Sequence, residues 1–420
     1  MQLFFYTLLL AGCAAPQSYK LMPTPILYVD TSLDPFAHLS DEHKTQRPHV
    51  YYATNRIVKG SAGNLSYSNE IDTNIHFGKA IIRMGEPGFS WDDIRRSSLS
   101  AVGSEAIPLY LEQIHKNGSI QQSTDLDLLD PQKKLKQFFN DINAELSRSV
   151  DKEIMLYVHG TKVNFANATI LATEVEHFGG RDFVSLAFSW PSHQNILSYF
   201  LGVDVKRALE SSEALTNVVA LLAKNTIATK INILSYSAGG KVTSKALHEL
   251  RNTYPDLDSK QLKEKFKIGS VVYACADVGI DVFLGRLTAS SELADQVIIT
   301  ISDSDDVLEA AKRFMGGTDR TGTAKAEPLE TAYITEKGFE NVTIIDVSIG
   351  QEIRGFDISG HHYWYRHPWV SSDIIFLMRT DLPPHRRGLQ ASEYDDVWYL
   401  SPDYPQSVQE AVRTELGSQW

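Results

Sequence analysis

The chain has 420 residues, of which 43% are hydrophobic and 22% are charged, enough apolar material to bury a sizeable core. A formal net charge of −12 at pH 7 argues against nucleic acid as the main partner, because phosphate binding needs basic patches. The two cysteines, Cys13 and Cys275, provide neither a disulfide framework nor zinc-ligand spacing. We expect no metal and no organic cofactor.

The N-terminus resembles a bacterial lipoprotein signal peptide over residues 1–12. Its apolar run is too short to span a bilayer and ends in Leu10-Ala11-Gly12-Cys13. No Lys or Arg precedes the run, which is a departure from the usual signal, and an ordinary hydrophobic strand is the alternative. Spacing and residue types favour lipidation of Cys13. Because Ala14 follows rather than an aspartate, we expect an anchor in the outer membrane, facing the periplasm.

The composition of the chain predicts four further segments. Residues 13–48 contain several prolines without clear periodicity, which predicts a tether behind the lipidated cysteine. The folded domain is predicted over residues 49–405, and residues 406–420 are expected to form a C-terminal tail. Within the domain, residues 85–127 have no clear pattern, and we expect an excursion over the sheet or a cap above the site.

Short apolar runs predict eight strands, which are residues 49–54, 77–82, 154–158, 183–188, 230–235, 268–274, 296–301 and 342–347. Between the later strands lie predicted helices over residues 164–178, 203–224, 241–252 and 307–315. An earlier helix is predicted to begin at Asp130-Pro131, with aspartate as N-cap and proline at the first helical position.

Most of these strands are continuous apolar runs, which is typical of a parallel sheet covered on both faces. Their alternation with helices indicates βαβ units with right-handed crossovers. We therefore predict an α/β protein with an eight-stranded, mostly parallel sheet flanked by helices, in the strand order of the α/β-hydrolase fold.

The fifth predicted strand leads into Ser235-Tyr236-Ser237-Ala238-Gly239, and a helix is predicted to follow. This strand–turn–helix context is that of a nucleophile elbow, G-x-S-x-G, which places Ser237 as the candidate nucleophile. Ser235 stands where the first glycine is usual. Serine-rich turns also cap helices, so the motif alone is weak evidence for a nucleophile. The assignment depends on whether a candidate acid and a candidate base accompany it.

The candidate acid follows the seventh predicted strand, in Ser302-Asp303-Ser304-Asp305-Asp306. We favour Asp305 and keep Asp303 in reserve; a helix N-cap cluster is the alternative, and both roles can hold together. Asp277, after the sixth strand, is a rival acid that we expect to be structural. The candidate base follows the eighth strand, where His361 is favoured over His362 because it directly follows glycine.

Two backbone N–H groups are expected to form an oxyanion hole. One belongs to Ala238, directly after the nucleophile, and the other to Thr161, in the His159-Gly160-Thr161 turn after the third strand. Trp190, in a Ser-Trp-Pro-Ser turn, and Tyr236 are expected to line the substrate pocket, although a rigid aromatic–proline turn is an equally good interpretation of Trp190.

Taken together, these segments resemble a group of bacterial α/β-hydrolases of unknown function, esterase- or lipase-like and often lipoproteins. The matching pieces are residues 52–56, 158–165, 188–192, the elbow, 276–278, 302–305, 360–361, 387–389, Trp398 and 403–405. The group usually has H-S-M-G at the elbow, where this chain has Y-S-A-G. The resemblance implies hydrolase chemistry without naming a substrate.

The leading hypothesis is a serine hydrolase that cleaves carboxylic esters, lipid or acyl esters among them, through an acyl-enzyme. Its partners would be a small ester or lipid substrate and, through the N-terminal lipid, the membrane. Amide cleavage or acyl transfer would use the same residues. The alternative is a catalytically silent hydrolase fold that acts as an envelope scaffold or binding lipoprotein.

Overall fold

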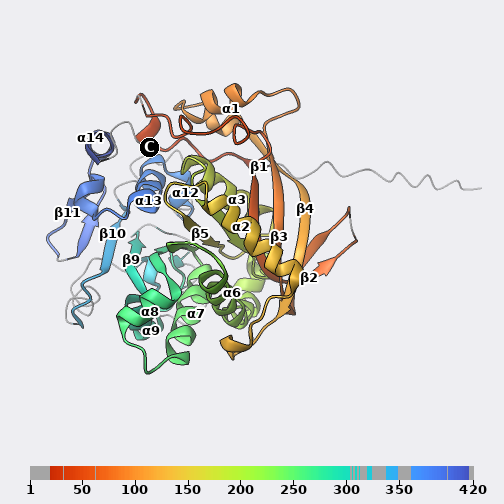
Figure 1. The fold of residues 1–420 in the computed structure, drawn as a ribbon. Coiled ribbons are helices and arrows are strands. Elements are labelled where there is room, and N and C mark those ends of the chain that lie inside the picture. Colours follow the sequence, from red (N-terminus) through yellow and green to blue (C-terminus); the bar gives the residue numbers. More distant parts are fainter. Residues whose placement is uncertain are drawn as a thin grey trace, which may run out of the picture.

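The computed structural model describes residues 19–31, 33–61, 63–302, 305, 308–309, 312, 319–323, 337–348, 361–394 and 396–415. These form one twisted sheet with helices on both faces (Figure 1). The strands are β1 Tyr19–Lys20, β2 His49–Lys59, β3 Ser66–Met84, β4 Pro108–Gln121, β5 Glu153–Val158, β6 Val184–Phe188, β7 Lys230–Tyr236, β8 Ile268–Ala274, β9 Ala294–Ile301, β10 Val342–Asp346, β11 Gln390–Ala391 and β12 Val397–Tyr399. The helices are α1 Trp91–Ser98, α2 Lys133–Leu146, α3 Phe165–Phe178, α4 Ile196–Phe200, α5 Val203–Glu210, α6 Ser212–Asn225, α7 Gly239–Thr253, α8 Ser259–Phe266, α9 Ile280–Leu293, α12 Tyr363–Arg366, α13 Pro368–Thr380 and α14 Tyr404–Glu415.

The sheet is larger than the predicted eight strands. Its twelve described strands follow the order β1-β4-β3-β2-β6-β5-β7-β8-β9-β10-β12-β11. From β2 to β12 in this order, each strand is parallel to its neighbours, whereas the pairings β1–β4, β4–β3, β3–β2 and β12–β11 are antiparallel. All eight predicted strands are present, and the α/β class with a mostly parallel sheet is confirmed. The four extra strands lie in its outer parts.

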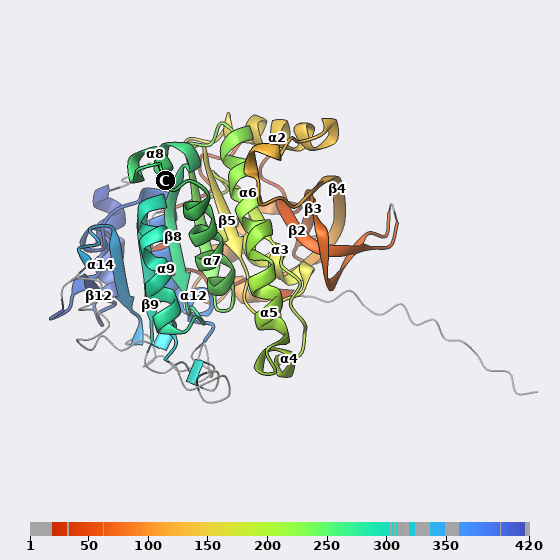
Figure 2. The same cartoon turned by 90° about the horizontal axis from the view of Figure 1, so that it is seen from below.

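The two faces of the sheet are covered by different helices. Along β5, Ile154, Leu156 and Val158 pack into a core with α2, α6, α7 and α9, while Met155 and Tyr157 point into a second core with α3, α13 and α14. Figure 2 shows α6, α7 and α9 side by side over the first face. Burial on both faces explains why the central strands have no hydrophobic alternation.

The segment expected to form an excursion over the sheet or a cap above the site contributes a strand to the sheet. Residues 85–127 contain α1 and β4, and β4 is hydrogen-bonded between β1 and β3. Most β4 side chains are partly or fully exposed. The strand was not predicted from the sequence because these residues are largely polar, and an outer strand needs no continuous apolar run.

The expected tether and tail are also folded against the domain. From Tyr19 onward the N-terminal segment packs into the core, with Leu27 and Phe36 at most 1% exposed. The expected tail lies largely in α14, which buries Val408. The Gln409 side chain on this helix donates hydrogen bonds to backbone carbonyls in the N-terminal segment, which joins the two ends of the chain.

Two predicted helices have different bounds. The helix predicted from Pro131 begins at Lys133, with Gln132 as N-cap, and Pro131 is buried ahead of the first turn. The helix predicted over residues 203–224 is divided at Ser211 into α5 and α6, where Asn55 donates a side-chain hydrogen bond to the Ser211 hydroxyl. Most of the helix predicted over residues 307–315 lies outside the described residues.

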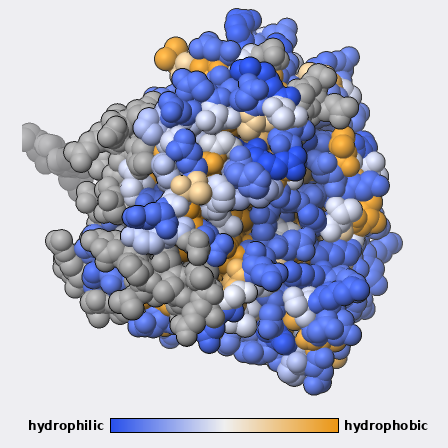
Figure 3. Space-filling view, turned by 90° about the vertical axis from the view of Figure 1, so that its left-hand side faces the viewer, coloured by the Kyte–Doolittle hydropathy of each residue, from blue (hydrophilic) through white to orange (hydrophobic). Residues whose placement is uncertain are grey.

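The surface in Figure 3 is mainly hydrophilic, with small apolar groups between polar residues. Of the helices in the described residues, none combines the length and the apolar character that crossing a bilayer requires. Residues 1–18, which include Cys13, lie outside the described part of the chain.

Candidate active site

Ser237 lies in a tight turn between β7 and α7. Its backbone has φ +52°, in the left-handed region that residues other than glycine rarely adopt. The turn is held by a hydrogen bond from the Ser237 N–H to the Ala274 carbonyl at 2.9 Å and by two N–H groups that donate to the Ser237 carbonyl. A Cβ on Gly239 would lie 2.5 Å from the Val158 carbonyl oxygen, so glycine is required there. The geometry is that of the predicted elbow.

The three residues predicted as nucleophile, base and acid meet in space. Nε2 of His361 lies 2.9 Å from Oγ of Ser237, and Nδ1 lies 2.7 Å from Oδ2 of Asp305. The three residues are at most 5% exposed. A carboxylate at Nδ1 assigns the proton to that nitrogen, which leaves Nε2 able to accept the serine proton. His362, the reserve base, packs its ring against His361 and Tyr236.

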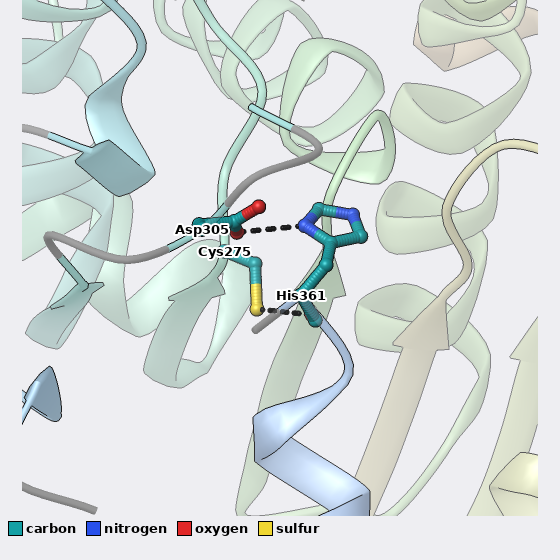
Figure 4. A group of neighbouring side chains, drawn as sticks. All are labelled: Cys275, Asp305 and His361. Carbon is teal, nitrogen blue, oxygen red and sulfur yellow. Dashed lines mark hydrogen bonds and ion pairs between the residues drawn. The ribbon is translucent and has the colours of Figure 1, made fainter. Parts of the chain in front are cut away.

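Asp305 combines two roles that the sequence divided between neighbouring aspartates. Its Oδ2 faces His361, and its Oδ1 accepts a hydrogen bond from the Leu308 N–H at 3.0 Å. One carboxylate therefore contacts both the imidazole (Figure 4) and the Leu308 N–H. Asp303, the reserve acid, lies outside the described residues.

Contacts from the ends of β8 and β9 hold the chain at His361 and Tyr363. The Cys275 thiol donates to the His361 carbonyl with Sγ and oxygen 3.0 Å apart. The Cys275 N–H lies 3.2 Å from both the Thr300 and the Tyr363 hydroxyl oxygens. Cys275 has φ +48° and is fully buried. Cys275, Asp305 and His361 also form a group that could hold a metal ion.

The loop expected to supply the second oxyanion donor passes directly over the elbow. A Cβ on Gly160 would lie 2.9 Å from the Cβ of Ser237. Within the described residues, the backbone N–H groups of Thr161 and Ala238 have no hydrogen-bond partner. Both N–H groups therefore have the unused donor capacity that a developing oxyanion would require.

His159 fixes the orientation of that loop. Burial, together with the nearby Arg56 guanidinium, lowers the pKa of His159 to about 3, so its imidazole is neutral at pH 7. Nδ1 lies 2.6 Å from the Gly160 carbonyl oxygen, closer than Nε2 to the Trp190 carbonyl at 3.0 Å, so we place the single proton on Nδ1. Because the Gly160–Thr161 peptide bond is trans, the Thr161 N–H points away from His159.

Asp204 supports the same loop from α5, and nothing in the sequence singled it out. Its fully buried carboxylate accepts a hydrogen bond from the Thr161 hydroxyl at 3.2 Å. It also accepts one from the His193 backbone N–H and lies 2.7 Å from Nδ1 of His193. An aspartate in the first turn of a helix is common, so only the three-dimensional contact reveals this role.

Asp277, the rival acid, belongs to a separate buried network. Its carboxylate lies 3.2 Å from Nζ of Lys241 and 3.4 Å from Nε of Arg320, and it accepts a hydrogen bond from the Tyr199 hydroxyl. Burial alone would raise the pKa of Asp277, but the two cations and the tyrosine hold it below its usual value. The network joins α4 and α7 beside the elbow and does not include His361.

The two residues expected to line the pocket have different positions. Trp190 is fully buried, stacks on the His159 ring at 5.1 Å between centroids and donates its indole N–H to the His159 carbonyl. Trp190 thus packs behind the Gly160–Thr161 loop, a position that fits the alternative interpretation, a rigid aromatic–proline turn, better than an open pocket wall. Tyr236 is 4% exposed, with its ring centroid 5.4 Å from that of His361.

The sheet, its crossover helices and the family match together define an α/β hydrolase. The chain belongs to the family described as "Alpha/beta hydrolase of unknown function (DUF900)", whose model matches residues 134–378, more than half of the chain. The family predicted from the sequence is confirmed, and the matched span includes Ser237, Asp305 and His361. No curated protein matches the chain.

Proposed function

We propose that this protein is a serine hydrolase that cleaves carboxylic esters, lipid or acyl esters among them, through an acyl-enzyme on Ser237. The observation that carries the proposal is the position of the His361 imidazole, which lies within hydrogen-bond distance of both the Ser237 hydroxyl and the Asp305 carboxylate. Nucleophile, base and orienting acid are thus in the order that acyl transfer needs.

In the proposed reaction, Nε2 of His361 removes the Ser237 proton as Oγ attacks the carbonyl carbon of the ester. Asp305 stabilises the imidazolium, and the N–H groups of Thr161 and Ala238 stabilise the oxyanion of the tetrahedral intermediate. The imidazolium then protonates the departing alcohol. In the second half-reaction His361 activates a water, and the carboxylic acid leaves as Ser237 regains its proton.

A fluorophosphonate probe tests the nucleophile directly. We expect the probe to label the folded protein at Ser237 and Ser237→Ala to abolish labelling. The matched control is Ser235→Ala, two residues earlier in the same elbow. The Ser235 hydroxyl is buried without a hydrogen-bond partner in the described structure, so its removal should leave labelling intact. Labelling that survives Ser237→Ala would contradict the assignment.

A panel of p-nitrophenyl esters of increasing acyl length tests the substrate class. We expect turnover that disappears in Ser237→Ala and that depends on acyl length. A folded protein that neither reacts with the probe nor turns over any ester would favour the silent scaffold instead.

We also propose that Cys13 is lipidated and anchors the protein in the bacterial cell envelope, at the outer membrane facing the periplasm. The lipobox-like residues before Cys13 support this. Metabolic labelling with a palmitate analogue should mark the protein and fail with Cys13→Ser, and the label should follow the outer-membrane fraction. An unmarked protein, or one found in the cytosol, would contradict the anchor.

A further inference from the structure

The end of β8 brings a thiol to the carboxylate–imidazole pair. The Cys275 sulfur, a carboxylate oxygen of Asp305 and a ring nitrogen of His361 all lie within 4.8 Å of one another. In Figure 4 the Asp305 carboxylate, after β9, faces the His361 ring, and the Cys275 side chain, at the end of β8, lies beside this pair with its sulfur directed at the His361 backbone carbonyl. Thiolate, imidazole and carboxylate are the ligand types that zinc takes in proteins.

We propose that Cys275, Asp305 and His361 bind a thiophilic divalent cation of the zinc class and that this binding switches off the hydrolase. The second half of the proposal rests on the proposed function; the first half does not. Nδ1 is the ligand nitrogen of His361, because it already faces Asp305, whereas Nε2 faces Ser237.

The donors are close to the spacing that a metal requires. Bonds of about 2.0–2.3 Å in a tetrahedral site place neighbouring ligand atoms roughly 3.3–3.8 Å apart. The present separations of 2.7 Å between Asp305 and His361 and at most 4.8 Å within the group bracket that range. Shifts of about 1 Å would therefore complete three protein bonds and leave one position for water or substrate.

Binding would inhibit the hydrolase because it moves the imidazole proton of His361 from one ring nitrogen to the other. The Cys275 thiol loses its proton to solvent and becomes a thiolate ligand. The neutral imidazole keeps its single proton, which moves from Nδ1 to Nε2 when Nδ1 takes the cation. Nε2 of His361 then donates toward Ser237 and can no longer accept the serine proton.

The donor set also predicts selectivity. Mg²⁺ and Ca²⁺ prefer several oxygen ligands, and this group offers one carboxylate, so neither ion should compete.

The binding half is tested without any measurement of activity. Co²⁺ added to the full chain should produce a thiolate-to-cobalt charge-transfer absorption that Zn²⁺ abolishes and Mg²⁺ does not. The chain has two cysteines, which provides a matched pair of variants. Cys13→Ser should keep the absorption, and Cys275→Ser or Cys275→Ala should lose it. Retention of the band in both Cys275 variants, or no band in Cys13→Ser, would overturn the site.

The inhibition half compares ester turnover with and without Zn²⁺ for each variant. Loss of a ligand should raise the zinc concentration for half-inhibition by at least about tenfold in Cys275→Ser, with no change in Cys13→Ser. Equal sensitivity of the two variants would overturn the proposed inhibition. If no ester is turned over while the cobalt band appears as expected, the hydrolase assignment fails and the metal site stands.

Discussion

Asp305 uses its two carboxylate oxygens for different partners, Oδ2 for His361 and Oδ1 for the Leu308 N–H. The orientation of the His361 ring and the hydrogen bond to the Leu308 N–H therefore depend on the same side chain. Amide and alanine replacements separate the two effects, because only the amide can still cap.

Asp305→Asn should cut kcat by about 10⁴, since a side-chain amide can donate to Nδ1 and impose the wrong imidazole tautomer. Its free energy of unfolding should change little, because the amide oxygen can still accept the hydrogen bond from the Leu308 N–H. Asp305→Ala should be equally inactive and also lose about 1 kcal/mol of stability, because the Leu308 N–H loses its partner. Ester turnover and urea unfolding measure the two effects. An active Asp305→Asn variant would rule out the orienting role.

Gly160→Ala should lower turnover by about 10²–10³ while the protein still folds. The added Cβ would lie 2.9 Å from the Cβ of Ser237, so the oxyanion loop must move away from the elbow. Gly285→Ala in α9 is the matched control, because an added Cβ there has no neighbour within 4 Å. Equal turnover in the two variants would show that the loop does not depend on this close approach.

Thr161→Val should reduce kcat by about tenfold and leave KM nearly unchanged. The backbone N–H remains, but the loop loses its hydrogen bond to the buried Asp204 carboxylate and is held less accurately. Thr161→Ser keeps the hydroxyl and should keep most of the activity. A rise in KM with unchanged kcat would instead indicate that Thr161 contacts the substrate.

Stability should fall between about pH 4.5 and pH 8 because of Glu174. Burial raises the pKa of this carboxyl from 4.5 to about 8, although it accepts a hydrogen bond from the Met22 N–H. In this window the folded state holds a proton that the unfolded chain has released, so the free energy of unfolding decreases as pH rises. The loss should amount to a few kcal/mol in total.

Glu174→Gln should flatten this pH dependence. Relative to the wild-type protein, its free energy of unfolding should therefore be more favourable at pH 8 than at pH 5. Urea unfolding at the two pH values measures the difference, with Glu105→Gln on the exposed surface as control. If Glu174→Gln kept the full pH dependence, another group would be responsible.

Much of the site could be predicted from the sequence because its three principal residues each follow a predicted strand, Ser237 and Asp305 closely and His361 after a loop. The apolar runs that end at β7, β9 and β10 placed Ser237, Asp305 and His361 at the same edge of the sheet. Residues at strand ends can be predicted in this fold because strands buried on both faces form continuous apolar runs that are easily located in the sequence.

The supporting residues had no such signal. Asp204 occupies an ordinary helical position and acts through a tertiary hydrogen bond to a loop far away in the sequence. The left-handed backbone at Cys275 and its contact with the His361 carbonyl are invisible in a run that reads as plain strand. The outer strand β4 was missed because its exposed residues have no apolar pattern.

The short segment between Cys13 and the first strand limits the distance between a lipid anchor and the folded domain. Only residues 14–18 separate Cys13 from Tyr19, where β1 pairs with β4. Even fully stretched, that length spans about 20 Å. A molecule acylated at Cys13 would therefore hold the edge of its sheet within that reach of the leaflet surface.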